Sequence, residues 1–308
     1  MVPIVYSPAY NVSAFGLERL HPFDGRKYRR IHDWLIAQGL RRPGDFVAPG
    51  PCPRRDLLTV HTPAYLRSLW RPRVLARILE VWPVALLPPC LTRWRVLRPM
   101  RRATGGTVLA CRLALERGLA VNLGGGYHHA GPASGGGFCV YADVPIALAL
   151  LHREGLLRSA LVVDTDAHQG NGTADTIRPW PWAHIVDFFE EDIYPWPKRE
   201  EDMPVPLPPG TGATYLERLA EHVPEALRRY QPDLVVYNAG SDVLGTDPLS
   251  RLMLTAGELA ERDLYVVTEA RERKVPLAMV LSGGYGPLSW EAHAASVEGI
   301  LARFDRQV

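Results

Sequence analysis

Lysine is scarce in this chain of 308 residues. Only Lys27, Lys198 and Lys274 stand among 35 basic residues, so that 32 are arginine, and the formal net charge is +2. A charge this small gives no support for a nucleic-acid partner. The excess of arginine is more typical of a genome's base composition than of a phosphate-binding surface, so we expect no nucleic acid among the partners.

Cysteine is scarce as well. The four cysteines show no CxxC spacing and are few for a chain of this length. A disulfide framework and a zinc cluster held by thiolates are therefore both disfavoured. We expect four reduced cysteines: Cys52, Cys90, Cys111 and Cys139.

Long apolar runs are also missing. No stretch is long enough to span a bilayer, and the first residues, MVPIVYSPAYN, lack a basic start followed by an uninterrupted apolar run. We therefore expect no signal peptide and no membrane span, and we predict a cytoplasmic protein. Internal repeats and low-complexity tracts are absent from the sequence too.

Short apolar runs alternate along the chain with longer helical patterns. The runs are continuous, which is typical of strands covered by helices on both faces; they span residues 2–6, 119–123, 160–164, 184–189, 233–238 and 276–282. Helical patterns occupy residues 104–118, 144–155 and 213–230, and another follows Thr255, where the letters TAGE fit a capping box. This order predicts a three-layer α/β/α sandwich with a mainly parallel central sheet and functional loops at the carboxyl ends of the strands.

Two stretches read as irregular: residues 70–102, where arginine, proline and tryptophan are interspersed, and residues 190–212, rich in proline and acids. Elements that we predict to belong to one sheet flank both stretches, so we expect insertions in a single domain, residues 1–308. Six tryptophans in or near these stretches indicate packing under loops, or else an interface: Trp70, Trp82, Trp94, Trp180, Trp182 and Trp196. Packing is the commoner case, and the oligomeric state stays open.

Two adjacent histidines follow the predicted strand at residues 119–123. His128 and His129 stand in GGGYHHAGPASGGGFC, between glycine-rich segments that let backbone approach a ligand closely. A lone histidine would more often be a hydrogen-bonded core residue. A pair so flanked at a strand end favours a functional site.

The stretch LVVDTDAHQGNG places two aspartates and a histidine at alternate positions, Asp164, Asp166 and His168. Carboxylate oxygen and imidazole nitrogen suit Zn²⁺ and other divalent metals, and the D-x-H spacing lets Asp166 and His168 converge from one extended turn. Asp164, two residues earlier, would then contact the residues around the metal without binding the metal itself. The same residues would also occur at a solvent-exposed strand end that precedes a helix cap. Two candidate ligands are, moreover, too few to define a metal site.

Two further strand ends carry Asp242, in YNAGSDVLGTD, and Tyr285, in LSGGYG. Alone, Asp242 would more often form a turn, and Tyr285 would pack. With Asp166 and His168, however, Asp242 completes a set of two carboxylates and one imidazole, which leaves positions open for water and substrate, as catalytic zinc requires. Beside a metal, the Tyr285 hydroxyl would donate to a developing oxyanion.

In their order and spacing, these motifs resemble the metal-dependent histone deacetylases of the arginase/deacetylase fold. The correspondence runs from YSPAYN and LERLHPFD through RRATGGT, GGGYHHAGPASGGGFCVYADV, DTDAHQGNGTADT and YNAGSD to LSGGYG, and it covers almost the whole chain. The details HQGNG, GGGFCVYAD and SGGY resemble the class IV branch most closely.

The resemblance implies a metal centre with one ion per chain. The ion is Zn²⁺, with Fe²⁺ as the alternative, and its ligands are Asp166, His168 and Asp242. Asp164 matches a carboxylate that partners His128 and contributes to a structural K⁺ site.

The resemblance also implies the residues that act on the substrate. His128 and His129 match the tandem histidines in acid/base roles, and Tyr285 matches the tyrosine that polarises the substrate carbonyl. Gly137 and Phe138 match the part of the pattern that lines the acyl-lysine tunnel.

One position departs from the commoner family pattern. Many relatives carry an aspartate where this chain has Asn171, whereas the class IV pattern has asparagine. A neutral partner stabilises an imidazolium less than a carboxylate does, so the protonation state of His129 is open at this point.

The implied reaction is hydrolysis of an amide by metal-activated water, which removes an acetyl or longer fatty acyl group from the Nε amine of lysine in a peptide or protein. The alternatives are deacetylation of acetylated polyamines or other small amides and, less favoured because every candidate catalytic group is present, a non-catalytic module that binds acyl-lysine. A binuclear manganese ureohydrolase needs D-x-H-x-D, and Gly170 cannot supply the last carboxylate. Without a basic tail, the family name does not imply a histone substrate.

Overall fold

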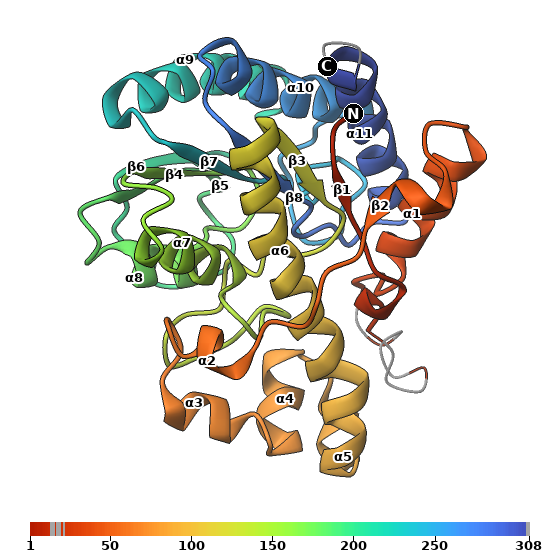
Figure 1. Ribbon diagram of the computed structural model, residues 1–308. Coiled ribbons are helices and arrows are strands. Elements are labelled where there is room, and N and C mark those ends of the chain that lie inside the picture. Colours follow the sequence, from red (N-terminus) through yellow and green to blue (C-terminus); the bar gives the residue numbers. More distant parts are fainter. Residues whose placement is uncertain (13–15, 17–19, 21, 306–308) are drawn as a thin grey trace.

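A computed structural model describes residues 1–12, 16, 20 and 22–305 of the protein (Figure 1). Part of the LERLHPFD motif, namely Leu17, Glu18, Arg19 and His21, lies outside the described residues. No helix within the described ranges is long and apolar enough to cross a membrane.

A single parallel sheet forms the centre of the molecule. Among the described residues it has eight strands in the order β2-β1-β3-β8-β7-β4-β5-β6, and every pair of neighbours is parallel. The strands are β1 (Ile4–Val5), β2 (Phe46–Val47), β3 (Leu119–Asn122), β4 (Ala160–Asp164), β5 (Ala183–Glu190), β6 (Met203–Leu207), β7 (Leu234–Asn238) and β8 (Leu277–Val280). All six predicted runs contain a strand, because continuous apolar residues are buried on both faces of the sheet.

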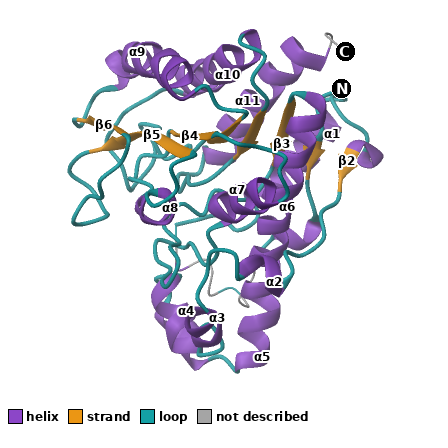
Figure 2. Cartoon of the chain, turned by 60° about the vertical axis from the view of Figure 1, so that its left-hand side comes forward, coloured by secondary structure: helices purple, strands orange, loops and turns teal. Residues whose placement is uncertain are grey.

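Helices cover both faces of this sheet. In Figures 1 and 2, α6, α7 and α8 lie on one face, and α9, α10 and α11 lie on the other, with α1 beside α11. These helices are α1 (Lys27–Ala37), α6 (Arg98–Arg117), α7 (Asp143–Arg153), α8 (Asn171–Ile177), α9 (Gly212–Tyr230), α10 (Ala256–Glu272) and α11 (Ser289–Phe304). The arrangement confirms the predicted three-layer α/β/α sandwich.

The capping box predicted after Thr255 begins α10. The Thr255 hydroxyl oxygen accepts from the Glu258 backbone N–H at 3.2 Å, and the Thr255 N–H donates to the Glu258 carboxylate at 2.8 Å. Two donors at the start of the helix are thereby satisfied by local residues.

The topology brings four candidate loops to one edge of the sheet. β3, β8, β7 and β4 are neighbours in the sheet, and the loops after them carry the two histidines, Tyr285, Asp242 and the D-x-H motif respectively. The register pairs Asp164 at the end of β4 with Asn238 on β7 and with Asp187 on β5. Residues far apart in the chain are therefore neighbours at the carboxyl ends of the strands, where open parallel sheets bind ligands.

A group of short helices projects from the sandwich below the sheet in Figure 1. This helical lobe, residues 54–101, contains α2 (Arg54–Leu57), α3 (Pro63–Ser68), α4 (Pro72–Ile78), a 3₁₀ turn (Trp82–Leu86), α5 (Pro89–Thr92), a π turn (Arg93–Leu97) and the first residues of α6. The expectation of irregular chain at residues 70–102 is wrong. Proline stands in the first turn of α3, α4, α5 and α6, where its missing N–H costs nothing and its fixed φ suits a helix.

The other stretch that read as irregular, residues 190–212, contains strand β6. Its side chains alternate between buried and exposed, and Pro204 and Pro206 are on the exposed side. A strand at the edge of a sheet tolerates residues that lack an N–H group, so the two prolines concealed a strand.

The tryptophans divide into two groups. Trp180 and Trp182 stack at 5.0 Å between ring centroids, and Trp182 also stacks on His152 at 4.0 Å, so both pack as expected. Packing is the wrong expectation for the other four, which are 50–70% exposed: Trp70, Trp82, Trp94 and Trp196. All four cysteines are free, as predicted.

Candidate metal centre and active site

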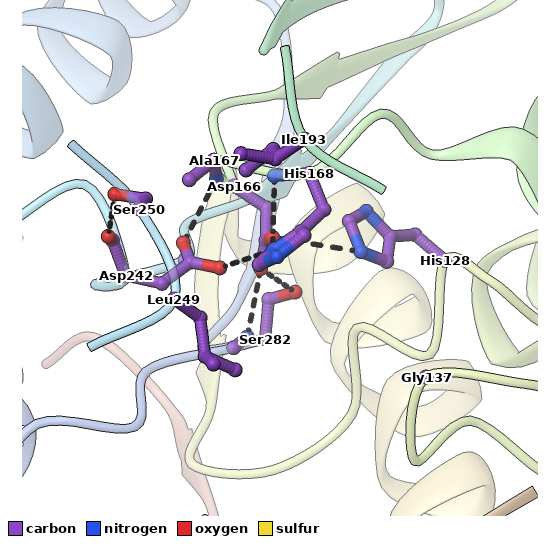
Figure 3. Close-up of polar contacts among 12 residues, drawn as sticks. His128, Gly137, Asp166, Ala167, His168, Ile193, Asp242, Leu249, Ser250 and Ser282 are labelled. Carbon is purple, nitrogen blue, oxygen red and sulfur yellow. Dashed lines mark hydrogen bonds and ion pairs between the residues drawn. The ribbon is translucent and has the colours of Figure 1, made fainter. Parts of the chain in front are cut away.

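Three candidate metal ligands meet at the carboxyl edge of the sheet. Asp166 and His168 lie on the loop after β4, and Asp242 lies on the loop after β7. The Nδ1 atom of His168 is 2.8 Å from Oδ2 of Asp242 and 3.3 Å from Oδ1 of Asp166 (Figure 3). One ligand atom from each residue lies within 4.8 Å of the others, and all three residues are buried.

Hydrogen-bond donors of the neighbouring loops orient both carboxylates of this group. Oδ2 of Asp166 accepts from the Ser282 hydroxyl and from the Gly283 N–H, both at 3.0 Å. Oδ1 of Asp242 accepts from the Ala167 N–H at 2.8 Å. The other oxygen of each aspartate faces the His168 ring, where a shared cation would bind, and that of Asp166 also accepts from the His168 backbone N–H at 3.1 Å.

The charges of the three residues fit a divalent cation. Burial and the nearby charge of Asp166 raise the pKa of Asp242 to about 7. Burial alone would raise the pKa of Asp166 too, but His128 and His168 hold it well below its usual range. Two buried carboxylates this close repel each other, and a cation between them removes that repulsion. Two carboxylates and one imidazole are ligands that Zn²⁺ accepts in catalytic sites.

The two adjacent histidines form a hydrogen-bonded chain beside this centre. Nδ1 of His128 is 2.9 Å from the Asp164 carboxylate, and Nδ1 of His129 is 2.7 Å from the amide oxygen of Asn171. The Nε2 atoms of the two rings are 3.1 Å apart. The partners of each histidine are therefore those that the family pattern implied.

These partners give the two imidazole rings different pKa values. Burial alone would lower the pKa of His128, but the charges of Asp166 and Asp164 outweigh it and raise the pKa to about 9. Burial and the charge of His128 lower the pKa of His129 well below its usual range, and the hydrogen bond that His129 donates to the Asn171 amide oxygen compensates only in part. The consistent state at neutral pH is a cationic His128 beside a neutral His129.

Tyr285 lies beside the candidate ligands. Its ring is 6.1 Å from the His168 ring in an edge-on arrangement, and burial, followed by the charges of Asp166 and Asp242, raises the pKa of its hydroxyl well above the usual value. The hydroxyl therefore keeps its proton. Its turn is held by Asp247, whose Oδ2 accepts from the Tyr285 N–H at 2.7 Å.

A narrow cavity of about 20 Å³ separates Tyr285 from the predicted tunnel residues Gly137 and Phe138. Gly137 has a positive φ of 49°, and a Cβ there would collide with the His129 ring. The Phe138 ring packs against the Phe23 ring in a tilted arrangement at 4.7 Å between centroids, and the Phe138 N–H donates to the Ile78 carbonyl at 2.9 Å. The glycine thus lets the tunnel loop approach the histidines, and the helical lobe anchors it.

Four residues of this region were not predicted. Asn238, at the end of β7, donates to the Asp164 carboxylate at 2.8 Å. The ring of Tyr194, 43% exposed, lies 5.0 Å from that of His129. Asn238 is the second residue of the motif YNAGSD, which is the signal that could have identified it, but nothing in the letters around Tyr194 distinguishes that residue.

The other two are buried cations that hold the loops. Lys27 donates from Nζ to the carbonyls of Ser282 and Gly283 at 2.6 and 2.7 Å, and burial lowers its pKa to about 8. Arg262, on α10, donates to the carbonyls of Thr165 and Gly240 at 3.0 and 2.8 Å. Both tie together backbone next to the candidate ligands.

Comparison with known proteins agrees with this geometry. The pattern of the histone deacetylase domain matches residues 21–301. The chain belongs to the histone deacetylase family. It is 40% identical to histone deacetylase 2 of Arabidopsis thaliana over 97% of this chain and 78% of that protein. It is also 26% identical to the acetoin utilization protein AcuC of Bacillus subtilis over 82% of this chain and 68% of that protein. Membership of this family supports a hydrolase with deacetylase activity.

Solved structures share the fold. The HDA15 HD domain superposes with a TM-score of 0.78 at 20% identity and covers 99% of this chain and 92% of that one. An acetylpolyamine aminohydrolase from Burkholderia pseudomallei superposes with a TM-score of 0.76 at 22% identity and covers 98% of this chain and 99% of that one. The arginase/deacetylase fold inferred from the motifs is therefore confirmed.

Proposed function

We propose that the protein is a zinc-dependent amidohydrolase that removes an acyl group from the Nε amine of lysine in a peptide or protein. The convergence of Asp166, His168 and Asp242 next to the histidine pair carries this proposal. Asp166, His168 and Asp242 would hold the ion, one per chain, with Fe²⁺ as the alternative metal. When bound, such an ion supplies Lewis-acid chemistry: it polarises a carbonyl and makes water more acidic.

His129 is the proposed general base. It is neutral, its Nδ1–H is held by the Asn171 amide oxygen at 2.7 Å, and its lone pair is therefore on Nε2. It would take the proton of the attacking water at Nε2 and later give a proton to the leaving lysine amine. His128, kept cationic by Asp164, would support the negative charge that develops.

Tyr285 is the proposed electrophilic group. Its hydroxyl stays protonated and would donate a hydrogen bond to the oxygen of the acyl carbonyl as that oxygen becomes an anion. Lys27 and Asp247 support this role, because they hold the two ends of the turn that carries the tyrosine.

The size of the cavity does not select an acyl length. About 20 Å³ is close to the volume that one water needs, so neither an acetyl group nor a longer chain enters without movement of the residues that line it. Gly137 and Phe138 would then line the path of the lysine side chain.

The test is a panel of substrates assayed with the zinc-loaded protein. Lysine peptides bearing acyl chains from acetyl to myristoyl are compared with acetylated polyamines, and the protein treated with a chelator is the control. We expect metal-dependent release of acid from the peptides, and the rates along the series identify the preferred acyl length. Faster turnover of acetylated polyamines would show that these, and not acyl-lysine peptides, are the substrate class. Binding of acyl-lysine without turnover of any substrate would favour a non-catalytic module.

Further parts of the assignment remain proposals. We propose a structural K⁺ site near Asp164, and we place the chain in the class IV branch because of HQGNG and the asparagine at Asn171. Gly170 supports one catalytic metal rather than two, since it offers no side-chain ligand. Continuous pairing across one sheet supports a single catalytic domain over residues 1–308.

A further inference from the structure

A second, much larger cavity lies in the helical lobe. Its volume is about 700 Å³, within the range of about 300–1,000 Å³ typical of small-molecule sites. It opens between α2, α3 and the segment that joins α5 to α6, and none of its lining residues belongs to the cavity at Tyr285. We call it the lobe pocket.

The lobe pocket has an apolar floor. Leu57, Leu66, Leu97 and Tyr141 line it, and all four side chains are buried. The indoles of Trp70 and Trp94 also line it, yet they are 56% and 50% exposed. Large apolar groups that remain exposed around a concave surface are typical of binding sites.

The same pocket is bordered by arginine. Arg54, Arg93, Arg98 and Arg101 line it, together with no aspartate or glutamate. Arg101 donates to the Cys52 carbonyl at 2.6 and 3.1 Å, and the Arg93 guanidinium lies 4.8 Å from the Trp70 ring centre. Within the described part of the chain, Arg54, Arg93 and Arg98 form no ion pair.

The charge of the chain is concentrated in this lobe. Residues 54–101 contain ten arginines against only two acids, Asp56 and Glu80, which gives the lobe a formal charge of +8. Since the whole chain carries +2, the remainder carries −6. A genome-wide preference for arginine does not explain this uneven distribution of charge, because such a preference would not make aspartate and glutamate rare in one lobe only.

We propose that the lobe pocket binds an amphipathic anion, namely a single apolar chain that ends in a carboxylate or phosphate group. The apolar chain would lie on the leucine floor between Trp70 and Trp94. The anionic group would be held at the rim by the unpaired guanidinium groups of Arg93 and Arg98, whose planar donors match carboxylate and phosphate oxygens.

The test measures binding and needs no turnover. Dodecanoate, dodecyl phosphate, dodecanol and acetate are each titrated into the protein by calorimetry, below the concentrations at which they form micelles. We expect one dodecanoate or dodecyl phosphate per chain, and binding of dodecanol and of acetate at least about tenfold weaker, because each lacks one half of the recognised chemistry. If dodecanol bound as tightly as the two anions, the arginines would take no part in recognition and the proposal would be refuted.

Matched variants locate the site. Arg98→Gln is expected to weaken the binding of both anions about tenfold, since a hydrogen bond to a charged group is worth about 1.5–3 kcal/mol and 1.4 kcal/mol is tenfold. Arg228→Gln makes the same change on an exposed position of α9 and is the control. An equal loss in both variants would mean general adsorption and would overturn the proposal.

A membrane surface is the competing source of the same chemistry. Sedimentation with vesicles that contain anionic phospholipid separates the two. Binding to vesicles without binding of the soluble anions would replace the pocket by a surface that recognises lipid headgroups.

Discussion

Exchange of Asn171 for aspartate places a carboxylate where an amide oxygen now lies 2.7 Å from Nδ1 of His129. Unit charges about 4 Å apart interact by about 4 kcal/mol at an effective dielectric constant of 20, and 1.36 kcal/mol corresponds to one pH unit. The cost of partly burying the new carboxylate offsets some of this, so we expect the pKa of His129 to rise by about 1–3 pH units. Asn171→Asp should thus convert a neutral base into one that is protonated at higher pH.

The pH dependence of kcat/KM for an acetyl-lysine peptide measures this change. A low pKa of His129 keeps the wild-type protein active towards acid pH, so the acidic limb of Asn171→Asp should move to higher pH by the same 1–3 units. Asn171→Ala removes the hydrogen bond without adding a charge; it should lower kcat and leave the limb near its wild-type position. An acidic limb that stays in place for Asn171→Asp, or one that moves equally for Asn171→Ala, would refute the assignment of His129 as the base.

Three further changes test other parts of the site. Tyr285→Phe should lower kcat on the order of 10²-fold or more while elemental analysis finds the metal unchanged; near wild-type turnover would remove Tyr285 from the mechanism. Asp242→Ala should lose metal and activity together, and an undiminished metal content would reject it as a ligand. Arg262→Met should lower the free energy of unfolding by about 3–5 kcal/mol in urea denaturation, because it removes the cation that lies 2.7 Å from the buried Asp263 and leaves that carboxylate only neutral hydrogen-bond donors; a loss below about 1 kcal/mol would contradict this.

The sequence predicted the sheet and the candidate ligands for one physical reason. Strands buried on both faces must be apolar throughout, so the residues where polarity begins, Asp164 at the end of β4 and Asn122 at the end of β3, mark the strand ends. Parallel strands then bring all such ends to one edge. The family resemblance added the role of each residue, which residue types alone did not distinguish from turns and caps.

The residues that hold the loops were beyond prediction. Lys27 and Arg262 donate to backbone carbonyls of segments more than twenty residues away, and any residue offers such a carbonyl. From sequence alone, a charged residue on an amphipathic helix is predicted to face solvent, because the buried group that it contacts is not known. The helical lobe was missed because arginine, proline and tryptophan alternate there without a clear apolar period, although its prolines stand in the first turns of helices.

The strand order has a consequence for the order of folding. Leu119 of β3 pairs with Leu277 of β8, so the centre of the sheet cannot close until β8 has been synthesised. Until then β3 and β7 both present an unpaired, apolar edge to other chains. During translation the first strands therefore remain without their final neighbour until β8 has been made. Pairing of strands so far apart in the sequence is also slow in a complete chain, so we expect slow, aggregation-prone refolding. In that process the loop of His128 and His129 reaches the candidate metal ligands last.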